Sequence, residues 1–183
     1  MSHVCPWRLA YTFDNRLRSM VHRSEKLLSP YVRPGMTVLD VGCGMGIFTI
    51  GIARLVGDGG LVIAVDIQRE MLDVVERRAA KAGVHHRIRT HLCGPDTLGN
   101  HKNVNFALAF WMVHEVRSPN KFFEQVYSCL GSESLFLLSE PRGHVSAKFF
   151  GKLIDGAHNA GLRLCHEPRI CFSRAAVFSK DGF

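Results

Sequence analysis

The 183-residue sequence lacks the features that mark a membrane or secreted protein. It contains no apolar run approaching the roughly 18 residues that a membrane-spanning helix needs. Residues 1–8 are polar and lack the apolar core of a signal peptide. We therefore expect a cytoplasmic protein that makes no membrane contact.

Metal-binding cysteine pairs are also missing, because no two cysteines stand in a C-x-x-C arrangement. His85, His86 and His91 lack the spacing of zinc ligands, and we interpret them as surface residues. We expect no metal site and mostly free thiols, as is usual in a reducing compartment. One alternative stays open, in which three thiolates bind a metalloid such as arsenite. The six cysteines are Cys5, Cys43, Cys93, Cys129, Cys165 and Cys171.

Patterns typical of RNA-binding modules are absent, since no strand-like segment interleaves basic and aromatic residues. The sequence does carry a formal net charge of +7, with basic residues concentrated in residues 8–33 and 77–89. Such a charge attracts anionic partners. We interpret it as charge on solvated helix faces, so a nucleic-acid partner is not favoured.

No repeat, linker or low-complexity segment divides the chain, so we expect one domain over residues 1–183. Short apolar runs alternate with stretches of helical periodicity, which predicts βαβ units. The sequence thus indicates the α/β class: a doubly wound, mostly parallel seven-stranded sheet with a C-terminal antiparallel hairpin and helices on both faces. The expected strands are 37–41, 61–66, 88–93, 104–110, 134–140, 162–167 and 170–178, and the expected helices include 48–56, 71–82, 119–130 and 147–157. Ser118, followed by a first-turn proline, and Ser146 are the expected caps of the last two helices.

The most specific motif is a glycine loop, Asp40-Val41-Gly42-Cys43-Gly44-Met45-Gly46, between an expected strand and an expected helix. Open α/β sheets bind ligands beyond the carboxyl ends of their strands, where this loop falls. Glycines allow unusual backbone angles and a close approach of the ligand. The N-terminus of the next helix adds positive potential that suits a carboxylate.

An acidic residue, Asp66, ends the next expected strand and lies 20 residues past Gly46. A carboxylate there can accept hydrogen bonds from ribose hydroxyls. The loop and Asp66 together predict a ligand that carries a nucleoside. The dinucleotide fingerprint needs a small third residue, but the bulky Ile47 occupies that position. The motif therefore does not favour a nicotinamide cofactor.

This glycine loop resembles motif I of the class I S-adenosylmethionine (SAM)-dependent methyltransferases, and the resemblance extends from about residue 30 to residue 178. It implies a Rossmann-like core over residues 31–183, a helical lid over residues 1–30, and SAM as the cofactor. In that family the residues corresponding to Cys93-Gly94-Pro95-Asp96 contact adenine, and those corresponding to Phe110 and Trp111 contact the methionine end of SAM. The resemblance predicts cofactor contacts at Asp40, Gly42, Cys43, Gly44, Gly46, Asp66, Ile67, Met71, Cys93, Gly94, Phe110, Trp111 and, from the lid, Tyr11.

Candidate proton acceptors follow the fourth expected strand. His114 titrates near neutrality and could accept a proton from an oxygen or nitrogen nucleophile, or it could order the loop. Glu115 is the second catalytic candidate, with an ion pair or a helix cap as its alternative role. Glu140 and His144 follow the fifth strand and either line the acceptor pocket or fix the turn.

Little of the chain remains for a substrate domain once the core is assigned, which favours a small, partly apolar acceptor. The expected walls are Trp7, Phe13, Trp111 and Met112. No Asn/Asp-Pro-Pro-aromatic run follows the fourth strand, which disfavours an enzyme that methylates nucleic-acid amino groups. The alternatives are an RNA or protein methyltransferase, or a SAM- or nucleotide-binding module without activity. We expect a monomer or a homodimer.

Overall fold

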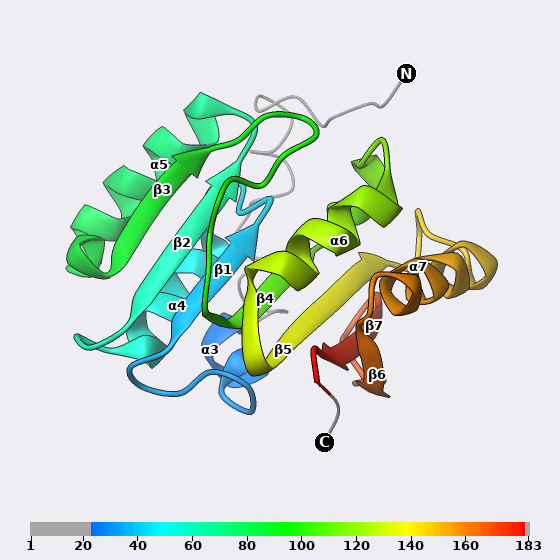
Figure 1. Ribbon diagram of the computed structural model, residues 1–183. Coiled ribbons are helices and arrows are strands. Elements are labelled where there is room, and N and C mark those ends of the chain that lie inside the picture. The colour runs from blue at the N-terminus through cyan, green and yellow to red at the C-terminus, as the bar shows by residue number, and fades with distance from the viewer. Residues whose placement is uncertain (1–22, 182–183) are drawn as a thin grey trace. The chain divides into compact units, whose positions relative to one another are not determined.

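The structure, a computed structural model, describes residues 23–181, which divide into one unit ending at Cys93 and a second beginning at Gly94 (Figure 1). Seven strands form a mixed sheet in the order β3-β2-β1-β4-β5-β7-β6. This order confirms the predicted doubly wound α/β class. The single domain over residues 1–183 stays a prediction. Most of the expected lid lies outside the described residues. This part includes the predicted cofactor contact Tyr11 and two expected walls of the acceptor pocket, Trp7 and Phe13.

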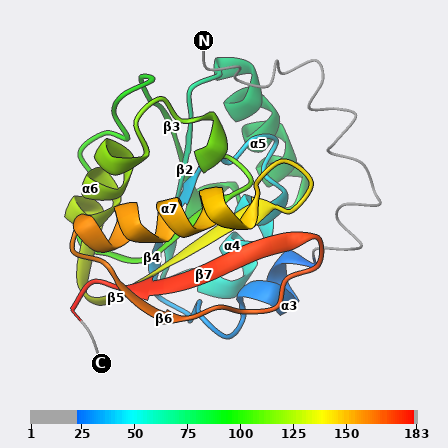
Figure 2. The same cartoon turned by 90° about the vertical axis from the view of Figure 1, so that its right-hand side faces the viewer.

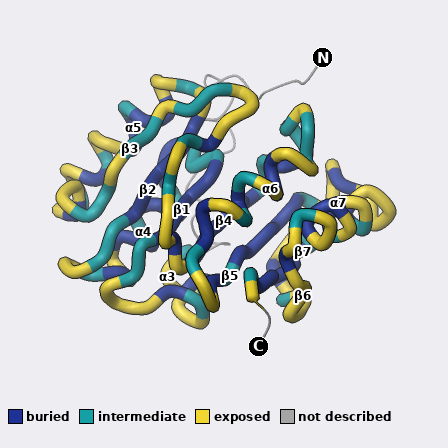
Figure 3. Tube along the Cα trace, in the orientation of Figure 1, coloured by how far each residue is buried: buried dark blue, intermediate teal, exposed yellow. Residues whose placement is uncertain are grey.

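In the first unit, three parallel strands carry the glycine loop and Asp66 at their carboxyl ends. Val41 pairs with Val65, and Asp66 pairs with Leu92. β1 and β2 are almost wholly buried, whereas the edge strand β3 has only half-buried and exposed residues (Figure 3). The elements are α3 (Ser24–Leu28), β1 (Thr37–Val41), α4 (Ile47–Val56), β2 (Leu61–Asp66), α5 (Arg69–Lys81), the 3-10 turn η1 (His85–Arg87) and β3 (Ile88–Leu92).

Helices α3, α4 and α5 of this unit pack against one another in sequence order (Figure 1). The close approach of α3 to α4 depends on Gly51, because a Cβ atom there would lie 2.1 Å from the Ser24 hydroxyl oxygen. The buried face of α5 is made by residues at helical spacing, as the sequence predicts. Those residues are Met71, Leu72, Val74, Val75 and Ala79.

In the second unit, β4 and β5 are parallel, and β7 pairs antiparallel with both β5 and β6 (Figure 2). The predicted C-terminal antiparallel hairpin is therefore confirmed. β5 begins four residues earlier than the expected strand, where its pairing with β4 shifts register. The elements are β4 (Val104–Phe110), the 3-10 turn η2 (Val113–Glu115), α6 (Pro119–Cys129), β5 (Leu130–Pro141), α7 (Ala147–Asn159), β6 (Arg163–His166) and β7 (Ser173–Ser179).

The two helix starts of this unit differ in how they are capped. Ser146 accepts a hydrogen bond from the Phe149 amide at 3.1 Å and caps α7 as expected. Ser118 precedes α6, which begins on Pro119, but the expected side-chain cap is wrong because the Ser118 hydroxyl makes no capping bond. No helix within residues 23–181 combines the length and apolar character that crossing a membrane requires.

Candidate functional site

The glycine loop of the first unit has left-handed backbone at all three of its glycines. Their φ angles are +63° at Gly42, +53° at Gly44 and +84° at Gly46. The loop folds back on itself, since the Gly46 amide donates to the Cys43 carbonyl at 3.0 Å. The Cys43 amide donates to the Val65 carbonyl of the neighbouring strand at 3.1 Å. A strand-to-helix loop of this kind brings main-chain amides to the ligand edge of the sheet.

Asp66 and the glycine loop are directly bonded. The Gly44 amide donates to Asp66 Oδ2 at 3.0 Å, and the Gln68 amide donates to Oδ1 at 2.9 Å. Burial raises the pKa of Asp66, and the backbone hydrogen bonds oppose that rise. The Ile67 amide also bonds this carboxylate and helps to lower its pKa. An ionised carboxylate offers about four lone pairs, so Asp66 can accept from a sugar hydroxyl while it holds the loop.

Asp40 lies beneath the loop and is almost fully buried. Its Oδ2 atom accepts a hydrogen bond from the Thr49 hydroxyl at 2.6 Å, which ties the end of β1 to α4. Burial raises the pKa of Asp40 to about 7, against the lowering effect of the Thr49 hydrogen bond. The geometry makes Asp40 a support of the loop. Its direct contact with the cofactor stays a prediction.

Cys43 and Cys93, the thiols in the described part of the first unit, are half-buried, and their raised pKa values favour the protonated form at neutral pH. Burial raises the pKa of Cys43 well above its ordinary value, and the charges of Asp40 and Asp66 add to that rise. Burial also raises the pKa of Cys93 to about 11. The thiolate is the form that binds soft metals and metalloids, so these shifts weigh against the arsenite alternative. Within residues 23–181, no three His, Cys, Asp or Glu side chains gather closely enough to hold a metal ion.

Other predicted cofactor contacts in this unit differ in exposure. Ile67, directly after Asp66, is 39% exposed, as a side chain that covers a ligand would be. Met71 is buried and packs with Met45 and Val74. Arg78 was not found by sequence reasoning, because no local pattern marks it. Its guanidinium donates to the Met45 carbonyl at 2.9 Å and so anchors the glycine loop to α5.

In the second unit, Gly94 forms an isolated bridge with Thr97, which shapes the loop after β3. Phe110 ends β4 in the buried core. Trp111 follows it with a left-handed φ of +62°. The Trp111 indole N–H donates to the Ser173 hydroxyl at 2.9 Å, and its amide donates to the Ser139 carbonyl at 2.7 Å. Neighbouring strands thus hold Trp111 in a backbone conformation that is rare for a bulky residue.

The loop after Trp111 brings His114 against a buried acid. His114 Nδ1 is hydrogen-bonded to Glu140 Oε2, and its Nε2 lies 3.9 Å from Glu115 Oε1. Glu140 Oε1 accepts from the Val113 amide at 2.7 Å. The hydrogen bond to Glu140 raises the pKa of His114; desolvation opposes this rise, and the charges of Glu140 and Glu115 add to it. Sequence reasoning placed His114 and Glu140 in the same region but did not pair them.

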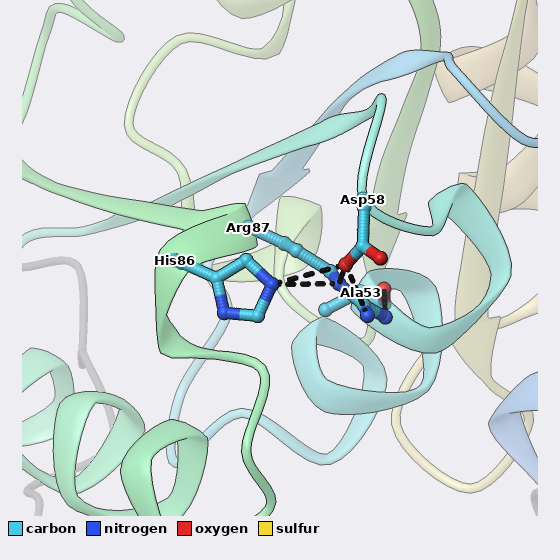
Figure 4. Close-up of polar contacts among 4 residues, drawn as sticks. All are labelled: Ala53, Asp58, His86 and Arg87. Carbon is cyan, nitrogen blue, oxygen red and sulfur yellow. Dashed lines mark hydrogen bonds and ion pairs between the residues drawn. The ribbon is translucent and has the colours of Figure 1, made fainter.

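Three polar side chains at the opposite, amino-terminal end of β2 and β3 form a separate cluster (Figure 4). Arg87 bonds Asp58 through its Nε atom at 2.9 Å and reaches the Ala53 carbonyl at 3.2 Å. His86 Nε2 lies 3.1 Å from the same Asp58 oxygen. His85 and His86 are exposed, as expected, and this cluster joins the end of α4 to the start of β3.

Comparison with known proteins gives a family match over most of the chain. A model of the methyltransferase domain family matches residues 33–168, about three quarters of the sequence, and so covers parts of both units. A solved SAM-dependent methyltransferase from Aquifex aeolicus superposes with a TM-score of 0.85 at 22% identity, over 96% of this chain and 98% of that one. At that identity the superposition supports the fold alone.

Two curated relatives illustrate the range of acceptors among similar proteins. A demethylmenaquinone methyltransferase from Symbiobacterium thermophilum is 32% identical over 120 residues, which are 65% of this chain and 47% of the relative. A ribosomal protein L11 methyltransferase from Thermotoga petrophila is 36% identical over 72 residues, which are 39% of this chain and 26% of the relative. The chain thus spans less than half the length of these relatives.

Proposed function

The chain belongs to the methyltransferase domain family, and on that premise we propose that it transfers the methyl group of SAM to a small-molecule acceptor. One observation carries the proposal: the Gly44 amide bonds the carboxylate of Asp66, which joins the two elements expected to hold the cofactor. SAM supplies an electrophilic methyl group on a good leaving group, so the protein mainly has to bind, orient and exclude water.

The residues of the first unit have roles that fit their chemistry. Asp66 accepts hydrogen bonds from the ribose hydroxyls, and Ile67 packs on the adenine ring beside it. The glycine loop and the N-terminus of α4 attract the carboxylate of the amino-acid tail. Asp40 and Arg78 support the loop from below and from α5. The remaining predicted contacts (Gly42, Cys43, Gly46, Met71, Cys93, Gly94, Phe110 and Trp111) complete this proposal.

A small acceptor is supported by the half-buried aromatic and sulfur side chains after β4, Trp111 and Met112. An RNA acceptor would need the basic surface to bind phosphates, and its affinity would fall steeply with salt. A monomer or homodimer in the cytoplasm, without membrane contact, stays our prediction. His114 is the proposed base, with Glu115 as the second candidate.

Calorimetry with SAM, S-adenosylhomocysteine and NAD tests the cofactor. We expect both adenosyl compounds to bind and NAD not to bind. Binding of NAD without either adenosyl compound would contradict the proposal. Methyl transfer from labelled SAM to phenols, amines, thiols and metalloids then tests the activity, with bulk RNA at two salt concentrations as the competing acceptor. Transfer to RNA alone would overturn the small-molecule assignment.

A further inference from the structure

The carboxylate of Glu140 is completely buried at the end of β5, yet both of its oxygens have a donor. The Val113 amide donates to Oε1 at 2.7 Å, and His114 Nδ1 faces Oε2. A buried carboxylate without such partners would be strongly unfavourable. Glu140 therefore holds the turn η2 at two successive residues, through the backbone amide of Val113 and the imidazole ring of His114.

This contact determines which tautomer the neutral His114 ring adopts. An ionised carboxylate only accepts hydrogen bonds, so Nδ1 must carry the proton that joins the two side chains. In the neutral ring, Nε2 is then the unprotonated nitrogen with a free lone pair. The His114 side chain is 20% exposed, whereas Glu140 is 0% exposed. The pair thus resembles a partly exposed base with its orienting acid buried behind it.

We propose that Glu140 is a positioning residue that fixes His114 in the Nδ1–H form, so that Nε2 takes the proton from a hydroxyl group of the methyl acceptor, as in a phenol or an enol. This inference rests on the proposed function and narrows its substrate class. Thiols are partly ionised near neutral pH and have less need of a base. A hydroxyl group of higher pKa gains most from a base held in the correct orientation.

The proposed step balances in atoms and charge. The acceptor oxygen forms a bond to the methyl carbon, and the carbon–sulfur bond of SAM breaks with its electron pair going to sulfur. The hydroxyl proton moves to His114 Nε2. The products are a neutral methyl ether, a neutral thioether and an imidazolium ion, which the carboxylate of Glu140 stabilises.

Three titratable groups of the second unit face His114. Glu140 comes from β5, Glu115 from the same turn η2, and the His144 ring from the loop after β5 lies edge-on at 6.1 Å between centroids. The two acids raise the pKa of His114, and the hydrogen bond that Nδ1 donates to Glu140 is the largest cause. The rate should therefore fall with decreasing pH at a higher pH than for an ordinary imidazole.

The substitution Glu140→Gln tests the role with little change in shape. The Gln carbonyl can still accept from the Val113 amide, but its NH₂ group would donate to His114 Nδ1 and leave the proton on Nε2. With catechol as acceptor and labelled SAM, we expect kcat to fall about 100-fold or more. The KM for SAM should stay unchanged, and the acidic limb of the pH profile should move to lower pH or vanish. The exposed Glu124→Gln on α6 is the matched control with unchanged kcat.

Nitrogen-15 NMR spectra of the unsubstituted protein provide a second test, because they show which nitrogen of the His114 ring carries the proton. We expect His114 to show a protonated Nδ1 and an unprotonated Nε2 at pH 8. The opposite tautomer would overturn the inference, and so would an unchanged kcat and pH profile in Glu140→Gln. An equal loss of activity of this variant with 2-mercaptoethanol and with catechol would also overturn it. Failure of the proposed function is distinguishable, because the unsubstituted protein would then either bind no SAM in calorimetry or methylate none of the small molecules. Failure of this inference alone leaves the unsubstituted protein active on them.

Discussion

The amide of Gly44 and the carboxylate of Asp66 are 22 residues apart in sequence and 3.0 Å apart in space. This bond fixes the glycine loop after β1 against the acid that ends β2. Asp66 orders the loop through this bond, and in the proposed function it also accepts hydrogen bonds from a sugar. The following predictions begin from that relationship.

Replacing Asp66 should weaken cofactor binding more than it weakens the fold. Asp66→Ala removes an acceptor of hydrogen bonds from both the loop and the ribose, so SAM affinity should fall by about 1.5–3 kcal/mol, or roughly 10- to 150-fold. Calorimetry measures the change. Asp58→Ala, at the opposite end of the same strands, is the control and should bind SAM normally. Unchanged affinity in Asp66→Ala would show that this carboxylate does not hold the sugar.

Two glycines of the loop should differ in their tolerance of a methyl group. A Cβ atom at Gly44 meets nothing within 4 Å, whereas one at Gly46 would lie 3.1 Å from Val75 Cγ2. Both substitutions to alanine carry the strain of left-handed backbone, about 1–2 kcal/mol. Gly46→Ala should lose about 1 kcal/mol more from overpacking. Urea unfolding measures both free energies, and equal losses would contradict the packing argument.

Asp40 should make the protein less stable as pH rises. Its pKa is about 7 in the folded protein and about 4 in the unfolded chain. Between these values the folded state binds more protons than the unfolded state, so the free energy of unfolding decreases with pH. Below pH 4 the group is neutral in both states, and above pH 7 its full penalty is present.

Asp40→Asn tests this linkage, because the amide oxygen can still accept from the Thr49 hydroxyl while the titration disappears. The variant should gain stability relative to the unsubstituted protein as pH rises from 4 to 7, and the difference should level off above 7. Denaturant unfolding at pH 4, 5.5, 7 and 8 provides the comparison. A difference that does not change with pH would mean that folding does not raise the pKa of Asp40.

The cluster at the amino-terminal end of β2 and β3 should affect stability alone. Arg87 is mostly buried and bonds both Asp58 and the Ala53 carbonyl. Arg87→Ala should therefore lower the free energy of unfolding by about 1–2 kcal/mol. Arg87→Lys should recover only part of that loss, because one ammonium group cannot reproduce the planar, multiply bonded guanidinium. Thermal unfolding measures the stability of both variants. A changed affinity for SAM in either variant would contradict the prediction, because it would place this cluster in the cofactor site.

Much of the candidate site could be predicted from local sequence. The glycine loop and Asp66 stand at the ends of short, continuous apolar runs, and such runs predict buried parallel strands whose carboxyl ends meet. The start of β5 could not be predicted in the same way, because it depends on a register shift against β4. The cap at Ser118 failed for a similar reason, since a capping residue shows only that a bond is available.

The sequence by itself determined the order of elements, the glycine loop and the acid beyond the next strand, because each of these depends on neighbours within a few residues. Tertiary structure alone paired Glu140 with His114, 26 residues away, and Arg78 with the Met45 carbonyl, 33 residues away. Such pairs carry no local signal, since other helices and strands lie between the two partners in the sequence. Strand register and burial decide which side chains come together and which oxygen of a carboxylate each one reaches.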